Sequence, residues 1–224
     1  MALFAALSYA VTQSGRGGGS VDKEKTELVA SRISSWLGLV QKEYQKIRII
    51  NGYGMDHLDL RVKNSGVAQP CQGFAEPDCA LYVSKSGQVP DFPFSSEEYV
   101  HTELPYCAGW DINPDNNAGA YTIRMQGVGS TSGGDLIIKI VCVKPDVCRA
   151  YNRSLGLSDT YPLDTFNEAH YTFSAGGSIP EPAAGANSDI GDEVAELQGK
   201  TTYCVRDGND GGLRSHIIFL LEAR

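Results

Sequence analysis

Six cysteines are the residues of this chain whose type most directly predicts chemistry. They show neither the Cys-x-x-Cys spacing nor the cysteine–histidine spacing of a zinc site. Six separate free thiols would be unusual, so we expect three disulfides and hence an oxidising compartment such as the periplasm or the cell surface. Cys71 and Cys79 enclose seven residues and could close a surface loop. The connectivity of the set stays open at this point; its members are Cys71, Cys79, Cys107, Cys142, Cys148 and Cys204.

The histidines and glycine-rich segments predict no catalysis. None of the four histidines (His57, His101, His170 and His216) belongs to a metal-binding motif, and no Gly-x-Ser-x-Gly elbow occurs. His216, at the head of an apolar run, is expected to be a packed histidine rather than a base. The segment 127–133 lacks the lysine of a phosphate-binding loop and predicts a hairpin turn. We therefore expect no enzyme and no catalytic or cofactor-binding residue.

Two loops contain the oxygen ligands that calcium prefers. In residues 111–119, Asp and Asn alternate, but Asn116 stands where the sharp turn requires glycine and Thr122 where the glutamate belongs. The second loop, 207–212, offers Asp207, Asn209 and Asp210. Ordinary turns are the favoured interpretation of both loops, so the sequence predicts no bound metal, with calcium at 207–212 as the alternative.

Composition limits the remaining classes. The 224 residues are 42% hydrophobic and 21% charged, which is typical of a globular protein of one or two domains. A formal charge of -8 argues against nucleic-acid binding, because a phosphate-binding face requires a basic patch.

The N-terminal segment 1–19 is expected to be an anchor half-helix followed by a glycine hinge. Residues 1–11 carry no charge, yet as a helix they would cover only about 16 Å, too little to span a bilayer. The glycines at positions 15 and 17–19 would permit bending. The alternatives are a short helix buried in a soluble core and a disordered tether. The anchor's apolar surface would come from Leu3, Phe4, Leu7, Tyr9 and Val11.

A globular head is expected over 20–224, beginning with an amphipathic helix over 20–51. One apolar stripe recurs at steps of three and four residues and consists of Val29, Ile33, Trp36, Val40, Tyr44 and Ile47. Ser20 is the predicted N-cap, Asp22, Glu24 and Glu27 favour the helix start, and Asn51-Gly52 predicts its end.

Strands dominate the rest of the head. The predicted strands are 59–62, 79–83, 120–126, 136–143 and 215–221. One helix interrupts them, from Pro145 in a first-turn position to a stop at Gly156. A long helix followed by strands with segregated helices predicts an α+β fold.

This order resembles the type IV pilins and pseudopilins. Several stretches, 2–17, 127–129 with 135–137, and 147–156, are similar to pilin-like proteins of alphaproteobacteria. The resemblance implies a long N-terminal helix packed on an antiparallel sheet, with a disulfide-bridged C-terminal region. It also implies a Cys148–Cys204 bond, because type IVb pilins tie a helix cysteine to one near the C-terminus; Cys107 and Cys142 are then left to pair. The loop 207–212 resembles in composition the calcium loop of major pseudopilins.

One feature of pilins is missing. Pilins carry a prepilin peptidase site and a glutamate near the mature N-terminus, whereas the first acidic residue here is Asp22. We therefore expect that the natural chain starts upstream of Met1; the alternative is a pilin-like fold that does not polymerise.

The function implied by the resemblance is that of a structural filament subunit at the bacterial cell envelope. Its partners would be copies of itself or other pilins, bound through the N-terminal helix, and the inner membrane before assembly. The alternative is a membrane-tethered periplasmic or surface binding module, with a ligand surface formed by Phe92, Phe94, Tyr99, Tyr106 and Trp110.

Overall fold

The computed structural model describes residues 18–49, 81, 89, 96–101, 107, 118–129, 134–159, 161–166, 169–170 and 189–224. Its helices are α2 (Gly18–Ile49), α3 (Ser96–Tyr99) and α4 (Pro145–Ser154), with 3-10 turns η3 (Ala195–Leu197) and η4 (Gly208–Asp210). Its strands are β1 (Ala118–Met125), β2 (Asp135–Ile140), β3 (Leu163–Asp164), β4 (Ala169–His170), β5 (Asp189–Ile190), β6 (Thr202–Asp207) and β7 (Ser215–Glu222). The fold class is α+β, as predicted.

Helix α2 buries the predicted stripe, and all six of its members lie in the core. The predicted start is wrong, because Gly18 and Gly19 are already helical and Ser20 therefore lies inside the helix. No acidic residue stands in the first turn, so Asp22 does not occupy the position expected of it. Each glycine costs a helix about 1 kcal/mol, which the long helix that follows can offset. Asn51-Gly52, the predicted stop, lies outside the described residues.

Helix α4 follows its sequence signals closely. Pro145 occupies the first turn, where its missing N–H is not required, and Gly156 adopts a φ of 71° just after the helix. Val147, Cys148, Ala150 and Tyr151 are buried. Leu155 forms the C-cap and is 37% exposed.

The sheet has the strand order β3-β6-β7-β2-β1-β4, and β5 also pairs with β1. Its centre is antiparallel, as expected, and β1 and β2 form the predicted hairpin around 127–133. Two short pairings, β3 with β6 and β5 with β1, are parallel. Strand β2 ends at Ile140 rather than Val143, because Cys142 has a left-handed φ of 57° that a strand cannot accommodate.

Both faces of the sheet are buried, which explains why 136–143 is apolar on both faces except at Lys139 instead of alternating. Ile138 and Ile217 face a core shared with α2 and α4. Their chain neighbours Ile137 and Ile218 face a second core that includes Tyr203 and Leu197.

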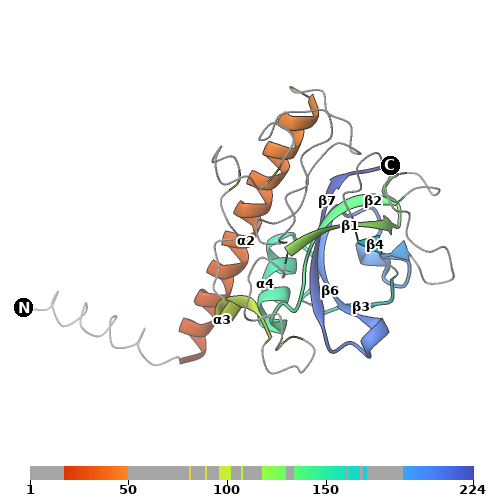
Figure 1. Cartoon of the computed structure of the whole chain (residues 1–224). Coiled ribbons are helices and arrows are strands. Elements are labelled where there is room, and N and C mark those ends of the chain that lie inside the picture. The colour runs from red at the N-terminus through yellow and green to blue at the C-terminus, as the bar shows by residue number, and fades with distance from the viewer. Residues whose placement is uncertain are drawn as a thin grey trace, which may run out of the picture.

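The resemblance implied that the long helix packs on the sheet. In the structure, most contacts of α2 with other elements are instead with α4. Helix α4 lies between part of α2 and the strands, and α2 contacts the sheet near the end of β7 (Figure 1). The three elements share one core, so α4 acts as the spacer that sets the distance of the long helix from the sheet.

The strand predicted over 79–83 is not supported at Leu81, its one described residue, which is buried in a turn. The strand predicted over 59–62 lies outside the described residues.

Candidate functional site

Helix α2 is the candidate assembly element, and its first turns leave the core. Every residue of 21–28 is at least partly exposed, and the buried stripe begins only at Val29. Large apolar side chains remain exposed along the helix, namely Val21 (63%), Leu28 (60%), Leu39 (44%) and Ile49 (79%). Residues 21–28, called the arm below, therefore lie outside the core, although they line grooves against α4.

The C-terminal end of α2 is locked to the last strand. Arg48 donates from Nε and Nη2 to the two carboxylate oxygens of Glu222, at 2.8 and 2.7 Å, and the Tyr44 hydroxyl also donates to Glu222. Gln41 donates to the carbonyl of Leu221 at 3.2 Å. Bidentate, charge-assisted bonds of this type fix an angle as well as a distance. The orientation of the arm relative to the sheet is thus set by side chains of α2 and β7.

Electrostatic effects agree with this arrangement. Burial raises the pKa of Glu222, but the hydrogen bonds from Arg48 and Tyr44 outweigh it, so the net pKa lies below the usual value. Burial and the neighbouring carboxylate raise the pKa of Tyr44 well above its usual range. The pKa of Arg48 is also raised, first by its hydrogen bond to Glu222. At neutral pH the three groups therefore form a phenol, a carboxylate and a guanidinium.

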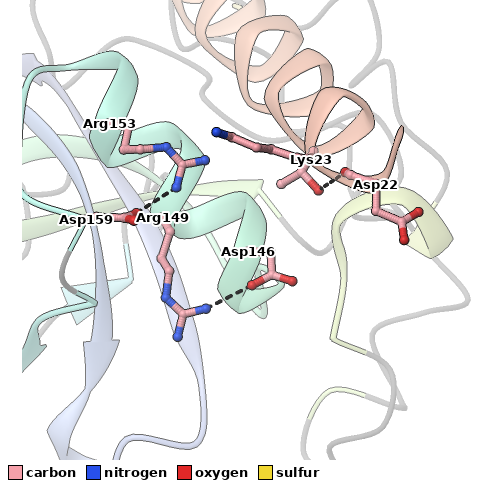
Figure 2. A pocket seen from close by; sticks show the side chains of 7 residues that line it. Asp22, Lys23, Asp146, Arg149, Arg153 and Asp159 are labelled. Carbon is pink, nitrogen blue, oxygen red and sulfur yellow. Dashed lines mark hydrogen bonds and ion pairs between the residues drawn. The ribbon is translucent and has the colours of Figure 1, made fainter. Parts of the chain in front are cut away.

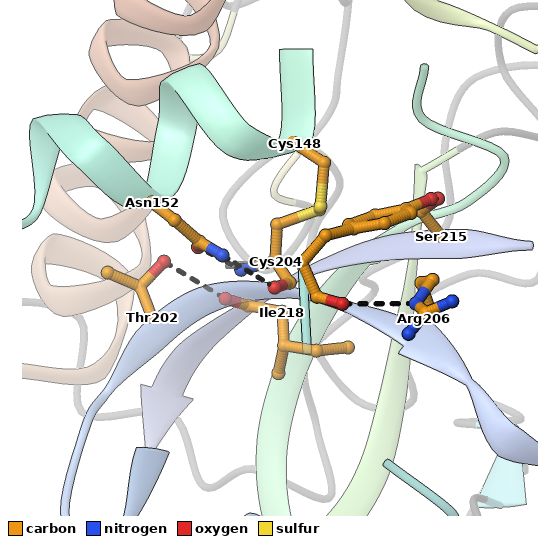
Figure 3. Close-up of a disulfide and its surroundings, with 8 residues drawn as sticks. Cys148, Asn152, Thr202, Cys204, Arg206, Ser215 and Ile218 are labelled. Atoms are coloured by element: carbon orange, nitrogen blue, oxygen red, sulfur yellow. Dashed lines mark hydrogen bonds between the residues drawn. A yellow bond between two sulfur atoms is a disulfide. The ribbon is translucent and has the colours of Figure 1, made fainter. Parts of the chain in front are cut away.

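A disulfide and a side-chain amide anchor α4 to the sheet at one residue. Cys148 is bonded to Cys204 of β6, the pairing that the resemblance implied. One helical turn later, Asn152 donates from Nδ2 to the Cys204 carbonyl at 2.9 Å and accepts from the Cys204 amide at 2.7 Å (Figure 3). The Asn152 side chain thus makes the two backbone hydrogen bonds that a neighbouring strand would make at Cys204, because β3 pairs only with residues 206–207 of β6. Sequence reasoning missed Asn152.

Cys107 is bonded to Cys142, the pair left over in the expected connectivity. Cys71 and Cys79 lie outside the described residues, so their expected bond stays a prediction. The two described bonds tie the chain before β1 and the helix α4 to the central part of the sheet.

A groove of about 400 Å³ runs between the start of α2 and helix α4. Figure 2 shows its lining by charged side chains of both helices. Arg149 pairs with Asp146 at 2.9 Å, and Arg153 pairs with Asp159 at 2.6 Å and with Glu27 at 3.6 Å. The groove's arginines are thus neutralised by carboxylates on the same surface, which makes it a charged helix–helix contact rather than a built anion site.

His216 is packed, as predicted. It is 1% exposed, lies edge-on to Phe166, and places Nε2 3.5 Å from Oδ2 of Asp207. His101 borders a second groove at the α2–α4 junction. The side chain of His170 and all of His57 lie outside the described residues.

The loop 207–212 uses its polar groups internally. Asp207 accepts from the Asn209 amide at 2.9 Å and pairs with Arg214 at 3.4 Å, while the Asn209 side chain donates to the Phe166 carbonyl at 2.7 Å. Burial raises the pKa of Asp207, but the hydrogen bonds from His216 and Asn209 outweigh it, so the pKa is lowered overall. Within the described ranges, no three His, Cys, Asp or Glu side chains gather as metal ligands. The loop 111–117 and the side chain of Asp210 lie outside the description.

The alternative function, a binding module, was expected to have an aromatic ligand surface that includes Tyr99. Tyr99 is fully buried in the core shared by α2 and α4, so it cannot line a surface. The other four aromatics, and the anchor residues Leu3, Phe4, Leu7, Tyr9 and Val11, lie outside the described residues.

The part of the chain that the structure describes contains no helix long and apolar enough to cross a membrane. Comparison with known proteins adds no relative: no protein-family model, curated protein or solved structure matches this chain.

Proposed function

We propose that this protein is a structural subunit of a type IV pilus-like or pseudopilus filament at the bacterial cell envelope. The observation that carries the proposal is the geometry of α2: a 32-residue helix that buries one face in the head from Val29 onward, whereas every residue of 21–28 is at least partly exposed. The uncharged run 1–11 precedes this helix in the sequence. Apolar N-terminal segments would form the filament core, and the heads would face outward.

Two further features support the proposal. The disulfides Cys107–Cys142 and Cys148–Cys204 are typical of a chain exported to an oxidising compartment. The hydrogen bonds that Glu222 accepts from Arg48 and Tyr44 keep the helix at a fixed angle. A repeating assembly requires the same angle of every subunit. The subunit's partners are then other copies of this chain or related pilins, and the inner membrane before assembly.

Charge substitutions in the apolar run test this role. Burial of each large apolar side chain is worth about 1.5–3 kcal/mol, and an aspartate there would oppose insertion into lipid or a filament core. Phe4→Asp and Leu7→Asp in the full-length protein should abolish surface filaments and membrane retention. The melting temperature of the head should not change, because the core formed by the described residues begins at Val29.

Leu213→Asp is the matched control, since Leu213 is 48% exposed in the loop between β6 and β7. It should leave filaments and membrane retention intact. Normal filaments and normal fractionation in both N-terminal variants would show that segment 1–11 is only a tail, and the proposed function would be wrong.

A further inference from the structure

Asp164 is the most completely buried carboxyl group for which the described chain offers no cation. It lies on β3, has 0% exposure, and accepts at Oδ2 from the Gly191 amide at 2.5 Å; the Thr165 backbone amide also favours its ionised form. Its other oxygen, Oδ1, has no hydrogen-bond partner. A buried carboxylate in this situation is costly unless it is paired or neutralised.

The groups that face Asp164 increase this cost. From the turn after β5, the acids Asp192 and Glu193 act on it by charge repulsion. From β6 it is faced by Tyr203, a phenol, and in register by Asp207, which is already paired with Arg214 and His216. Asp192 also has a buried oxygen, Oδ1, without a hydrogen-bond partner. No ion pair joins Asp164, Asp192 or Glu193 to a cation in the described part of the chain.

The hydrogen bond from Gly191 to Asp164 joins two segments that pair at opposite edges of the sheet. Strand β3 forms one edge of the sheet, next to β6, whereas β5 pairs with β1 near the other edge. The bond from Gly191 to Asp164 therefore links the segment after β5 back to the opposite edge. Beneath this link lie Ile137, Tyr203 and Leu197, and the same segment ends in η3, which supplies Leu197.

We propose that Asp164 is a proton-operated latch, which holds the segment 189–197 closed over the second core when it is protonated and loosens it when it is ionised. A proton is the neutralising ligand that the site can take, because the described carboxylates do not gather as a three-ligand metal cluster. Protonation removes the repulsion from Asp192 and Glu193 and the cost of a buried charge, whereas Oδ2 can accept from Gly191 in both forms. The latch is independent of the proposed filament role.

The pH range follows from the buried position. Burial raises the pKa of Asp164 to about 7, the Gly191 amide opposes this rise, and the charges of Asp192 and Glu193 add to it. In the unfolded chain an aspartate has a pKa of about 3.9. Between about pH 4 and pH 7 the folded protein thus holds a proton that the unfolded chain has lost, so stability falls as pH rises and levels off above the folded pKa.

Asp164→Asn in the full chain tests the latch, because asparagine keeps an acceptor for Gly191 but does not ionise. The melting temperature of the variant should exceed that of the wild type by a margin that grows from pH 5 to pH 7.5 and is constant above pH 8. That margin should be about 3 °C or more. Asp159→Asn, at an exposed carboxylate paired with Arg153, is the control and should show no such growing margin.

A local measurement separates the latch from a general change in stability. Hydrogen-exchange protection factors at Gly191 and Leu197 should fall between pH 6 and pH 8 in the wild type and stay constant in Asp164→Asn. A variant with the wild-type pH profile of melting or of protection would overturn the proposal. So would restoration of wild-type stability at pH 8.5 by calcium chloride, since the ligand would then be a metal ion rather than a proton.

Discussion

At the scale of single residues, Asn152 and Cys148 place α4 on the sheet through one shared partner. Both side chains engage Cys204, one by a covalent bond and the other by two hydrogen bonds to its backbone. Asparagine is a poor residue for a helix interior, so its burial in α4 at 1% exposure indicates a specific role. The amide satisfies a backbone N–H and C=O that would otherwise be buried without partners.

Asn152→Ala should therefore destabilise the protein by about 2–4 kcal/mol, because it leaves a buried donor and a buried acceptor unpaired. Urea denaturation of the full-length protein measures this loss. Arg153→Ala in the next position removes only surface ion pairs and should cost less than about 1 kcal/mol. Equal losses for the two variants would mean that the amide does not anchor β6.

This contact shows what the sequence could and could not provide. Cysteines can be recognised as disulfide candidates from the sequence, and the resemblance implied the Cys148–Cys204 bond that the structure contains. Asn152 carries no such signal, because its role depends on β6 passing one helical turn from Cys148. The spacing of residues in the sequence does not show that β6 passes beside this turn of α4.

At the scale of elements, the lock between α2 and β7 sets the direction of the long helix. Glu222 is 28% exposed at its side chain and receives three donors from α2. Its pKa is lowered overall, so its contribution to stability is present above its unfolded pKa of about 4.3 and is lost as pH falls through the folded value. This pH dependence has the opposite sign to that of Asp164.

Glu222→Gln should lower stability at pH 7 by about 2–3 kcal/mol, because Arg48 and Tyr44 lose a charged acceptor. The difference from the wild type should shrink below pH 4, as the wild-type carboxylate becomes protonated. Thermal melts at pH 3 and pH 7 check both statements. Glu43→Gln, which removes an i,i+3 pair with Lys46, is the control and should be nearly neutral. A glutamine variant as stable as the wild type at pH 7 would contradict the lock.

Long, patterned elements were predictable, and short ones were not. The stripe of α2, the proline and glycine that bound α4, and the apolar runs of β2 and β7 all lie in the structure close to their expected positions. Strand β6 was missed although Thr202, Tyr203 and Val205 favour β-structure, because charged residues and glycines follow at once. The two-residue strands β3, β4 and β5 exist only through their partners and leave no periodic signal.

At the scale of the whole molecule, the head has two cores, one on each face of the sheet, and the long helix α2 lies along one side (Figure 1). The disulfides and the α2–β7 lock hold the side that carries the helix, whereas Asp164 closes the other side. A rigid helix-bearing side and a separately closed outer side suit a subunit whose helix enters an assembly and whose other face meets the surroundings.

Immunogold electron microscopy tests the central claim most directly. Antibodies raised against the purified head, residues 20–224, would be applied to filaments sheared from cells that produce the full-length protein. We expect regular labelling along the filament shafts and its loss in the Phe4→Asp variant. Label confined to the periplasm or to unassembled monomer, with unlabelled filaments or none, would contradict the account.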